Sequence, residues 1–161
     1  MHGADVLHYG HDFLLRALDG LDESHYDKEA ICGVWTVKDV IAHLASHELV
    51  FIEILNTVLG NEVPMPNMQA MGTIGPAAFN ESEVDKRKSL SYREIWEEYD
   101  TAQQKVAELW VQIPEAKQHQ AGLLAWYGDE YDLEDFVAYS FYGHKREHSA
   151  QINVLKDKLS R

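Results

Sequence analysis

Two histidines, His144 and His148, lie one helical turn apart in the last strongly amphipathic segment of the chain. Steps of three and four residues through this segment pass along a stripe that is otherwise apolar. The stripe consists of Leu133, Val137, Phe141, His144, His148, Ile152, Leu155 and Leu159. Side chains four residues apart project from one side of a helix, about 6 Å apart along its axis, so both imidazoles can bind one cation. The spacing therefore predicts an inward-facing pair of metal ligands.

A third candidate ligand is His43, which borders the apolar stripe of an earlier predicted helix. Three neutral imidazoles suit a divalent transition metal and leave a position open for water or substrate. Zinc and nickel are favoured, and iron, cobalt or manganese also fit. His47, one turn beyond His43, is an alternative or additional ligand, and His47 or Glu48 in the fourth position would close the site. We predict a metal site formed by His43, His144 and His148.

Two other interpretations of the histidine pair remain open. A histidine on an apolar face can be a core residue hydrogen-bonded to a carbonyl, although two neighbouring buried imidazoles leave several nitrogens to satisfy. Residues 144–148 also match the His-x-x-Glu-His signature of the inverted zinc peptidases. Glu147, however, lies about 100° around a helix from the histidine stripe. We therefore interpret Glu147 as a surface acid.

Four long predicted helices must position these histidines. They cover residues 4–18, 36–59, 91–113 and 133 to near the C-terminus. The last three open on capping sequences at Thr36, Ser91 and Asp132, and Gly60 and Pro114 follow the ends of the second and third. No stretch alternates apolar and polar residues as a half-buried strand does. The pattern predicts an all-α four-helix bundle.

The connections complete the predicted architecture. A length of 161 residues fits one domain over residues 1–161. Residues 61–88, rich in Met, Pro, Gly and Asn, are too long for a simple turn. We expect them to form an irregular crossover or lid between the second and third helices.

Composition excludes several kinds of partner. The chain has 27 acidic against 14 basic residues, and its net charge of −13 repels a phosphate backbone or an anionic lipid surface. The single cysteine, Cys32, cannot form an internal disulfide. No apolar run reaches the roughly 20 residues that cross a bilayer. We expect a cytoplasmic protein with no nucleic-acid or membrane partner.

Two short motifs carry a family resemblance. The first is WTVKDVIAHL at residues 35–44, and the second is HxxxHxxQI at residues 144–152. Together they resemble the DinB-like superfamily, which includes bacillithiol and mycothiol S-transferases and the metal-binding domain of mycothiol-dependent maleylpyruvate isomerase. The resemblance covers essentially the whole chain. It implies a four-helix fold, metal ligands at His43, His144 and His148, a divalent transition metal and a homodimer.

Two reactions are open to such a site on chemical grounds. A bound ion can generate hydroxide for hydrolysis or can bind a low-molecular-weight thiol as thiolate for reaction with a small electrophile. The resemblance favours the thiol reaction, as in a transferase or isomerase. Cys32 lies in a loop with no neighbouring histidine, so the thiol would arrive as a cosubstrate. The alternatives are a non-catalytic metal-binding or stress-response protein and a metal-assisted hydrolase of a reactive small molecule.

Several neighbours are candidates for supporting roles. Tyr142 and Gln151 bracket the histidine pair and could orient a ligand, or hydrogen-bond a metal-binding imidazole. The acidic chain disfavours a strongly acidic substrate unless Arg87, Lys145 or Arg146 lines the entrance.

Overall fold

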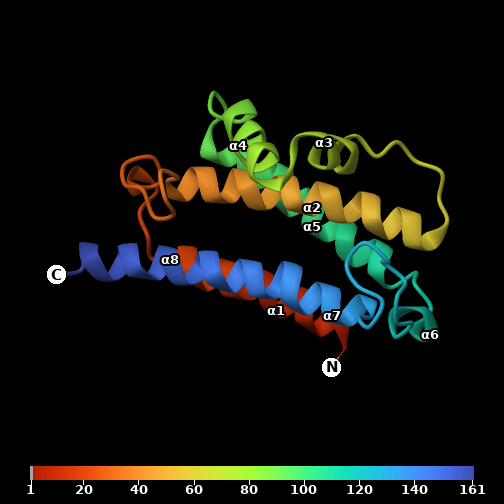
Figure 1. The fold of residues 1–161 in the computed structure, drawn as a ribbon. Coiled ribbons are helices and arrows are strands. Elements are labelled where there is room, and N and C mark those ends of the chain that lie inside the picture. The colour runs from red at the N-terminus through yellow and green to blue at the C-terminus, as the bar shows by residue number, and fades with distance from the viewer. Residues whose placement is uncertain (1) are drawn as a thin grey trace. The chain divides into compact units, whose positions relative to one another are not determined.

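The computed structural model describes residues 2–161, and helices dominate it (Figure 1). The helical elements are α1 (Gly3–Leu18), η1 (Glu23–His25), α2 (Val37–Leu59), α3 (Pro66–Ile74), α4 (Pro76–Lys86), α5 (Tyr92–Trp110), α6 (Glu115–Gln118), α7 (Leu133–Val137), η2 (Ala138–Tyr142) and α8 (Gly143–Leu159). Residues 2–161 contain no β-strand, only an isolated bridge between Cys32 and Trp35. The predicted all-α class is confirmed. Within the same residues, no helix has the combined length and apolar character that a membrane span requires.

The three predicted helix starts all carry reciprocal caps. At the start of α2, Asp39 N donates a hydrogen bond to Thr36 Oγ1 at 3.3 Å, and Thr36 N donates to Asp39 Oδ2 at 3.0 Å. Ser91 before α5 and Asp132 before α7 make the same exchange with the acid three residues later. Each exchange satisfies amide groups that a helix start otherwise leaves without partners, which explains why these boundaries could be predicted.

The predicted C-terminal ends of the helices agree less closely with the structure than the predicted starts do. α2 ends as predicted before Gly60, whose φ of 79° lies in the left-handed region that glycine adopts without a steric penalty. α5 ends at Trp110 rather than at the expected Ile113. A turn replaces the last helical residues, with Ile113 N donating to Trp110 O at 3.0 Å just before Pro114.

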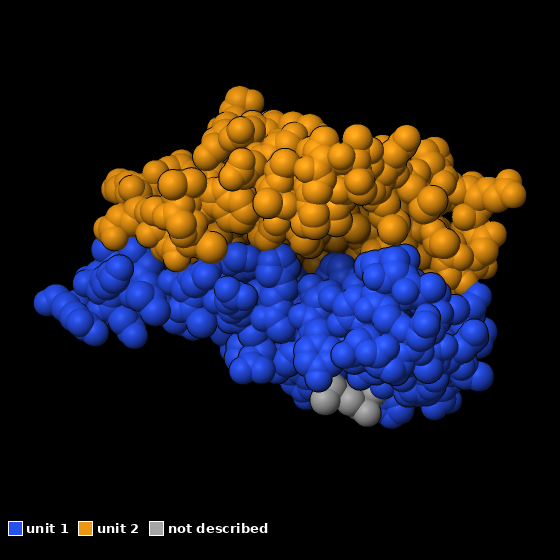
Figure 2. Space-filling model, in the orientation of Figure 1, with its two compact units in different colours: residues 1–21, 110–161 blue, residues 22–109 orange. Residues whose placement is uncertain are grey.

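The chain comprises two compact units, coloured separately in Figure 2. Unit 1 consists of residues 1–21 and 110–161, and unit 2 consists of residues 22–109. Unit 1 contains α1, α6, α7, η2 and α8. Unit 2 contains η1, α2, α3, α4 and all of α5 except its last residue, Trp110. The single domain expected over residues 1–161 stays a prediction.

Within unit 1, α1 and α8 lie side by side (Figure 1). Near the C-terminal end of α1, Lys156 Nζ donates to Asp19 O at 2.6 Å. At the other end of α1, Gly3 N donates to Glu134 Oε1 at 2.8 Å, so a carboxylate of α7 caps the first turn of α1. These two contacts fix both ends of α1 against the last helical segment, the one that carries the histidine pair.

The last helix is continuous but not uniformly α-helical. The π-helical segment η2 joins α7 to α8, with Gly143 N donating to Ala138 O five residues earlier. Within it Phe141 is buried while Tyr139 is 69% exposed. A π turn inserts extra backbone into a helix and is frequent near functional sites. The pattern of apolar residues contains no signal for this segment, so the π turn was not predicted.

Residues 61–88 of unit 2 connect α2 to α5, as the predicted long crossover requires, but the expectation that this crossover is irregular is wrong, because it forms α3 and α4. Each of these helices begins with a proline, Pro66 and Pro76, whose fixed φ suits the first helical position. The Pro and Gly residues that argued for irregular structure instead mark where the two helices start and where they meet, at Gly75.

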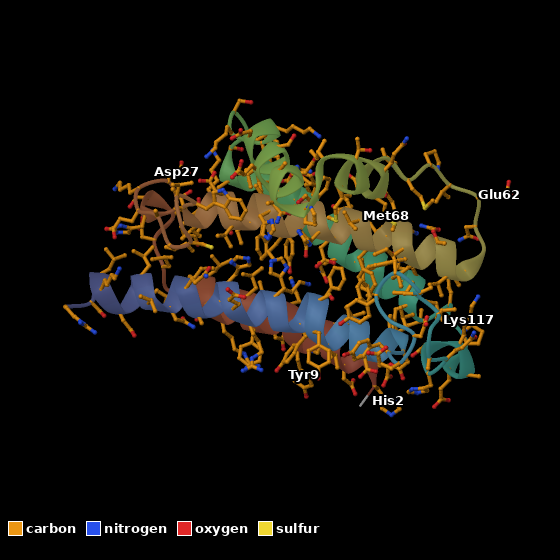
Figure 3. The ribbon with its side chains drawn as sticks, viewed as in Figure 1. His2, Tyr9, Asp27, Glu62, Met68 and Lys117 are labelled. Atoms are coloured by element: carbon orange, nitrogen blue, oxygen red, sulfur yellow. The ribbon has the colours of Figure 1, made fainter. Side chains whose placement is uncertain are left out.

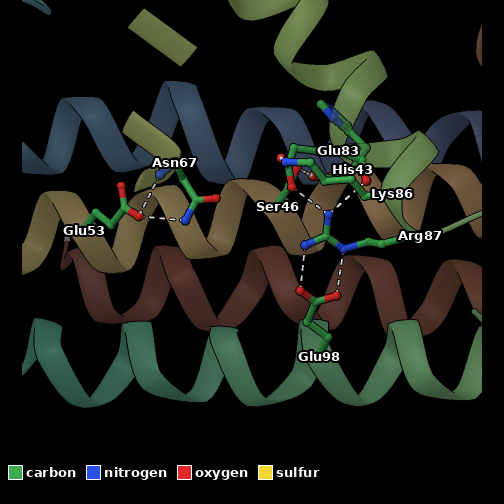
Figure 4. A network of polar contacts seen from close by, with 8 residues as sticks. All are labelled: His43, Ser46, Glu53, Asn67, Glu83, Lys86, Arg87 and Glu98. Carbon is green, nitrogen blue, oxygen red and sulfur yellow. Dashed lines mark hydrogen bonds and ion pairs between the residues drawn. The ribbon is translucent and has the colours of Figure 1, made fainter. Parts of the chain in front are cut away.

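Helix α3 is held by a polar contact rather than by buried side chains, since none of its residues is buried. The carboxylate of Glu53 on α2, itself only 6% exposed, accepts hydrogen bonds from Asn67 N at 3.0 Å and Met68 N at 2.8 Å. Figure 4 shows the Glu53–Asn67 contact, and Met68 is labelled in Figure 3. Glu53 therefore caps the N-terminus of α3 from a neighbouring helix.

A buried ion-pair network joins α4 to α5 within unit 2 (Figure 4). The Arg87 guanidinium, 7% exposed, donates to both carboxylate oxygens of Glu98 at 2.7 and 2.6 Å and to Glu83 Oε2 at 2.8 Å. Burial opposes ionisation of Glu83, but hydrogen bonds and charge from Lys86 and Arg87 outweigh burial and lower the pKa of Glu83. Arg87 is thus committed to structural ion pairs.

Candidate metal site

His144 and His148 lie on one side of α8 in unit 1, as their spacing predicts. Their ring centroids are 4.7 Å apart, and Nε2 of one ring lies 3.0 Å from Nε2 of the other. His148 is 4% exposed, and His144 is half-buried. The two imidazoles therefore direct the same type of nitrogen toward one point.

Gln151, one turn after His148, contacts the opposite nitrogen of that ring. His148 Nδ1 lies 2.8 Å from Gln151 Oε1. An amide oxygen can only accept, so this contact places a proton on Nδ1 and, in a neutral ring, the lone pair that can bind a cation on Nε2. Burial lowers the pKa of His148 and outweighs the opposing effects of Gln151 and Glu147. The neutral, metal-binding form of His148 is therefore favoured.

The geometry of the pair fits two ligands of one transition metal. Nitrogens that bind one zinc ion at tetrahedral positions are roughly 3.3 Å apart, because each Zn–N bond is about 2.0 to 2.1 Å long. The observed Nε2–Nε2 separation of 3.0 Å is close to that value. The fixed Nδ1 proton of His148 matches the usual support of a metal-bound imidazole. The donor set of α8 thus fits a divalent transition ion.

His43 lies on α2 in unit 2, seven residues after the Thr36 cap that starts the helix. Its side chain is 3% exposed, and its ring centroid lies 4.9 Å from the ring of Trp35 and 4.5 Å from that of His47. Trp35 precedes the cap, so the boundary that starts α2 also packs an aromatic ring against His43. This contact of Trp35 with His43 was not predicted from the sequence.

His47, the alternative ligand, is engaged by a different helix of unit 2. Its Nε2 lies 3.0 Å from Asn80 Oδ1 on α4. Because an amide oxygen accepts, this contact places a proton on His47 Nε2 and occupies that nitrogen. No sequence signal pointed to Asn80, since it lies within the segment expected to be irregular. The contact favours a positioning role for His47 beside His43 over a ligand role through Nε2.

The two acids near the candidate ligands in the sequence, Glu48 and Glu147, have different environments. Glu48 on α2 is 1% exposed. The pKa of Tyr99 on α5 is raised well above its usual value, mainly because Tyr99 is buried and secondly because the charge of Glu48 is nearby. Glu147 is exposed on α8, as expected for a surface acid. The peptidase signature at residues 144–148 therefore lacks a general base on the histidine side of the helix.

The remaining candidates have mostly structural contacts. Tyr142 packs edge-on against Phe13, and the Arg146 guanidinium lies 5.4 Å from the centroid of the Tyr142 ring. Lys145 is buried. Cys32 is half-buried in the turn that bridges to Trp35.

By their chemistry, His43, His144 and His148 are candidate ligands for one metal ion. The pair belongs to unit 1 and His43 to unit 2. The fold is all-α, and its histidines are candidate metal ligands.

The comparison with protein families identifies the chain more closely. The family described as mycothiol maleylpyruvate isomerase N-terminal domain matches residues 7–130, and the chain belongs to this family of the DinB-like superfamily. The match includes His43 and ends before His144 and His148. The assignment of those two histidines as candidate ligands therefore depends on their geometry on α8. None of the curated proteins compared matches the chain.

Two crystal structures resemble the fold. A protein from Streptococcus pneumoniae has a TM-score of 0.75 and 12% identity, covering 96% of this chain and 88% of the other. An uncharacterized protein from Clostridium difficile 630 has a TM-score of 0.72 and 12% identity, covering 96% and 94%. At this level of identity the likeness shows the fold alone.

Proposed function

We propose that this protein binds a divalent transition metal, zinc or nickel before iron, cobalt or manganese, through His43, His144 and His148. The observation that carries the proposal is the convergence of His144 Nε2 and His148 Nε2 at 3.0 Å in a member of this family. Two neutral imidazoles at that distance share one cation more favourably than they share one proton, because both lone pairs can then be used.

We further propose that the protein is an enzyme that joins a small thiol to a small electrophile or uses the thiol to isomerise it. A bound ion of this kind favours the thiolate form of a thiol. Conjugation forms one carbon–sulfur bond, breaks the S–H bond and releases the proton, with the leaving group departing from the electrophile. In isomerisation the same carbon–sulfur bond breaks again and the thiol is returned.

The chain's own residues would hold and orient the ligands in this reaction. Gln151 Oε1 accepts a hydrogen bond from His148 Nδ1–H, and Trp35 packs against the His43 ring. Asn80 holds His47 beside His43. Cys32 lies half-buried in a turn, so the reacting sulfur comes from a cosubstrate.

The experiment combines metal analysis with a conjugation assay on protein purified without a histidine tag. We expect about one transition ion per chain and thiol conjugation that is lost on chelation and restored by the ion. Activity without any added thiol would favour metal-assisted hydrolysis instead. Bound metal without turnover across a panel of thiols and electrophiles would favour a non-catalytic metal-binding protein.

A matched histidine variant controls for nonspecific loss of metal. His8 on α1 has a side chain that is 68% exposed and lies 3.5 Å from Asp12. His148→Ala is expected to lose the ion, whereas His8→Ala is expected to keep it. Equal metal content in the two variants would refute the assignment of His148.

A further inference from the structure

Gln151 makes a side-chain contact that determines which nitrogen of His148 carries the proton. Its Oε1 lies 2.8 Å from His148 Nδ1, and the residue stands three positions later on α8, on the same side of the helix. The ring is buried, so water competes poorly for that nitrogen. An oxygen acceptor at this distance stabilises the Nδ1–H tautomer over the Nε2–H tautomer.

We propose that Gln151 is a positioning residue that holds His148 in the Nδ1–H tautomer and thereby directs the Nε2 lone pair at the point shared with His144. The proposal deepens the proposed function and rests on it for its consequence, metal affinity. The tautomer itself is a property of the protein that can be measured with no metal present.

The position of His144 sharpens this inference. If His148 Nε2 carries a lone pair, a hydrogen bond across the 3.0 Å to His144 Nε2 requires that His144 donate the proton. To bind a metal through Nε2 as a neutral ring, His144 must carry its proton on Nδ1 instead. His148 is thus preset for metal binding, and His144 is the imidazole whose tautomer changes on loading.

The test uses three variants on α8. Gln151→Met keeps the length of the side chain but removes the acceptor, and Gln151→Glu restores an acceptor. Asn153→Met is the matched control, because Asn153 is exposed on the same helix. Nitrogen-15 NMR of the chelator-treated protein, at an alkaline pH where imidazoles are neutral, reports the tautomer. Competition with a chromophoric chelator reports zinc affinity.

We expect His148 to be in the Nδ1–H form in the wild type, in Asn153→Met and in Gln151→Glu, and to lose that preference in Gln151→Met. Zinc affinity should fall about tenfold to a hundredfold in Gln151→Met alone, the range for loss of a residue that supports a metal ligand. An Nε2–H tautomer in the wild type overturns the proposal without any variant. An unchanged tautomer and affinity in folded Gln151→Met overturn it as well.

The design separates this inference from the proposed function. If the wild type binds no transition metal but His148 depends on Gln151 for its tautomer, the positioning role stands and the metal function fails. If zinc binds at His148 but neither the tautomer of His148 nor the zinc affinity changes in Gln151→Met, the metal function stands and the positioning role fails.

Discussion

Replacing Arg87 by methionine should be among the most damaging single changes in unit 2. The guanidinium is 7% exposed and donates four hydrogen bonds, three to the carboxylates of Glu83 and Glu98 and one to the Glu83 carbonyl. Methionine has a similar length but no charge or donor. The variant leaves Glu83 buried with only Lys86 as a charged partner and leaves Glu98 with none of the contacts from Arg87.

The size of the effect follows from burial. Breaking a buried ion pair by removing one partner costs about 3 to 5 kcal/mol, because the remaining charge stays desolvated. Lys86 still neutralises part of the Glu83 charge, so we expect a value near the lower limit, about 3 kcal/mol. For a chain of this length that loss lowers Tm by roughly 6 to 12 °C.

The assay is urea unfolding at neutral pH, followed by circular dichroism, with Arg93→Met as the matched control. Arg93 pairs with Glu97, but their side chains are 87% and 63% exposed, so the loss should be below about 1 kcal/mol. A loss for Arg87→Met no larger than that for Arg93→Met would refute the argument from burial.

Acid should reduce the difference between Arg87→Met and the wild type. In the wild type the pKa of Glu83 lies below its ordinary value. The ionised carboxylate therefore contributes stability above the unfolded-state pKa, about 4.3, and that contribution is lost as the pH falls through the lower folded-state pKa. In the variant, protonation relieves a poorly compensated buried charge. A difference that grows on acidification below about pH 4 would contradict this account.

Three further predictions concern the fold and assembly. Glu53→Gln removes the charged cap of α3. Amide hydrogen exchange in residues 66–74 should therefore accelerate by a factor equivalent to about 0.5 to 2 kcal/mol, with the global Tm nearly unchanged. Equal protection of these amides in the variant and the wild type would contradict the cap. Gly3→Ala places a Cβ 2.0 Å from the Trp110 ring and should cost about 1 to 3 kcal/mol in urea unfolding, whereas Gly72→Ala, in open space on a helix, should be neutral or stabilising. Light scattering should give twice the chain mass if the expected homodimer forms, and a monomer mass would exclude it.

The long helices were predictable because their boundaries are encoded locally. The caps at Thr36, Ser91 and Asp132 each need only four consecutive residues, and Gly60 ends α2 through its own backbone freedom. The histidine pair was predictable for the same reason, since its members lie within one turn of a single helix.

The missed features depend on residues far apart in the sequence. α3 has no buried side chain, and its cap comes from Glu53, 13 positions before Pro66. The spacing of apolar residues does not indicate the π-helical segment at residues 138–142. Pro66 and Pro76 were the signals for helix starts in residues 61–88, but they were interpreted as signs of irregular structure.

Charged residues show the same limit. Glu53 and Arg87 are buried with hydrogen bonds to partners on other helices, which composition and helical periodicity do not reveal. Arg87, considered as a residue that lines the entrance to the site, instead holds α4 against α5. Asn80 was not considered because the helix that presents it to His47 was not predicted.

The central claim is that His43 completes a metal site with the histidine pair, and the metal content of His43→Ala tests it most directly. In this variant His144, His148 and Gln151 are unchanged, and α2 keeps its cap at Thr36. The account predicts about one transition ion per chain in the wild type, and a large loss of metal from a folded His43→Ala protein. Full metal occupancy in that variant would contradict the three-histidine site.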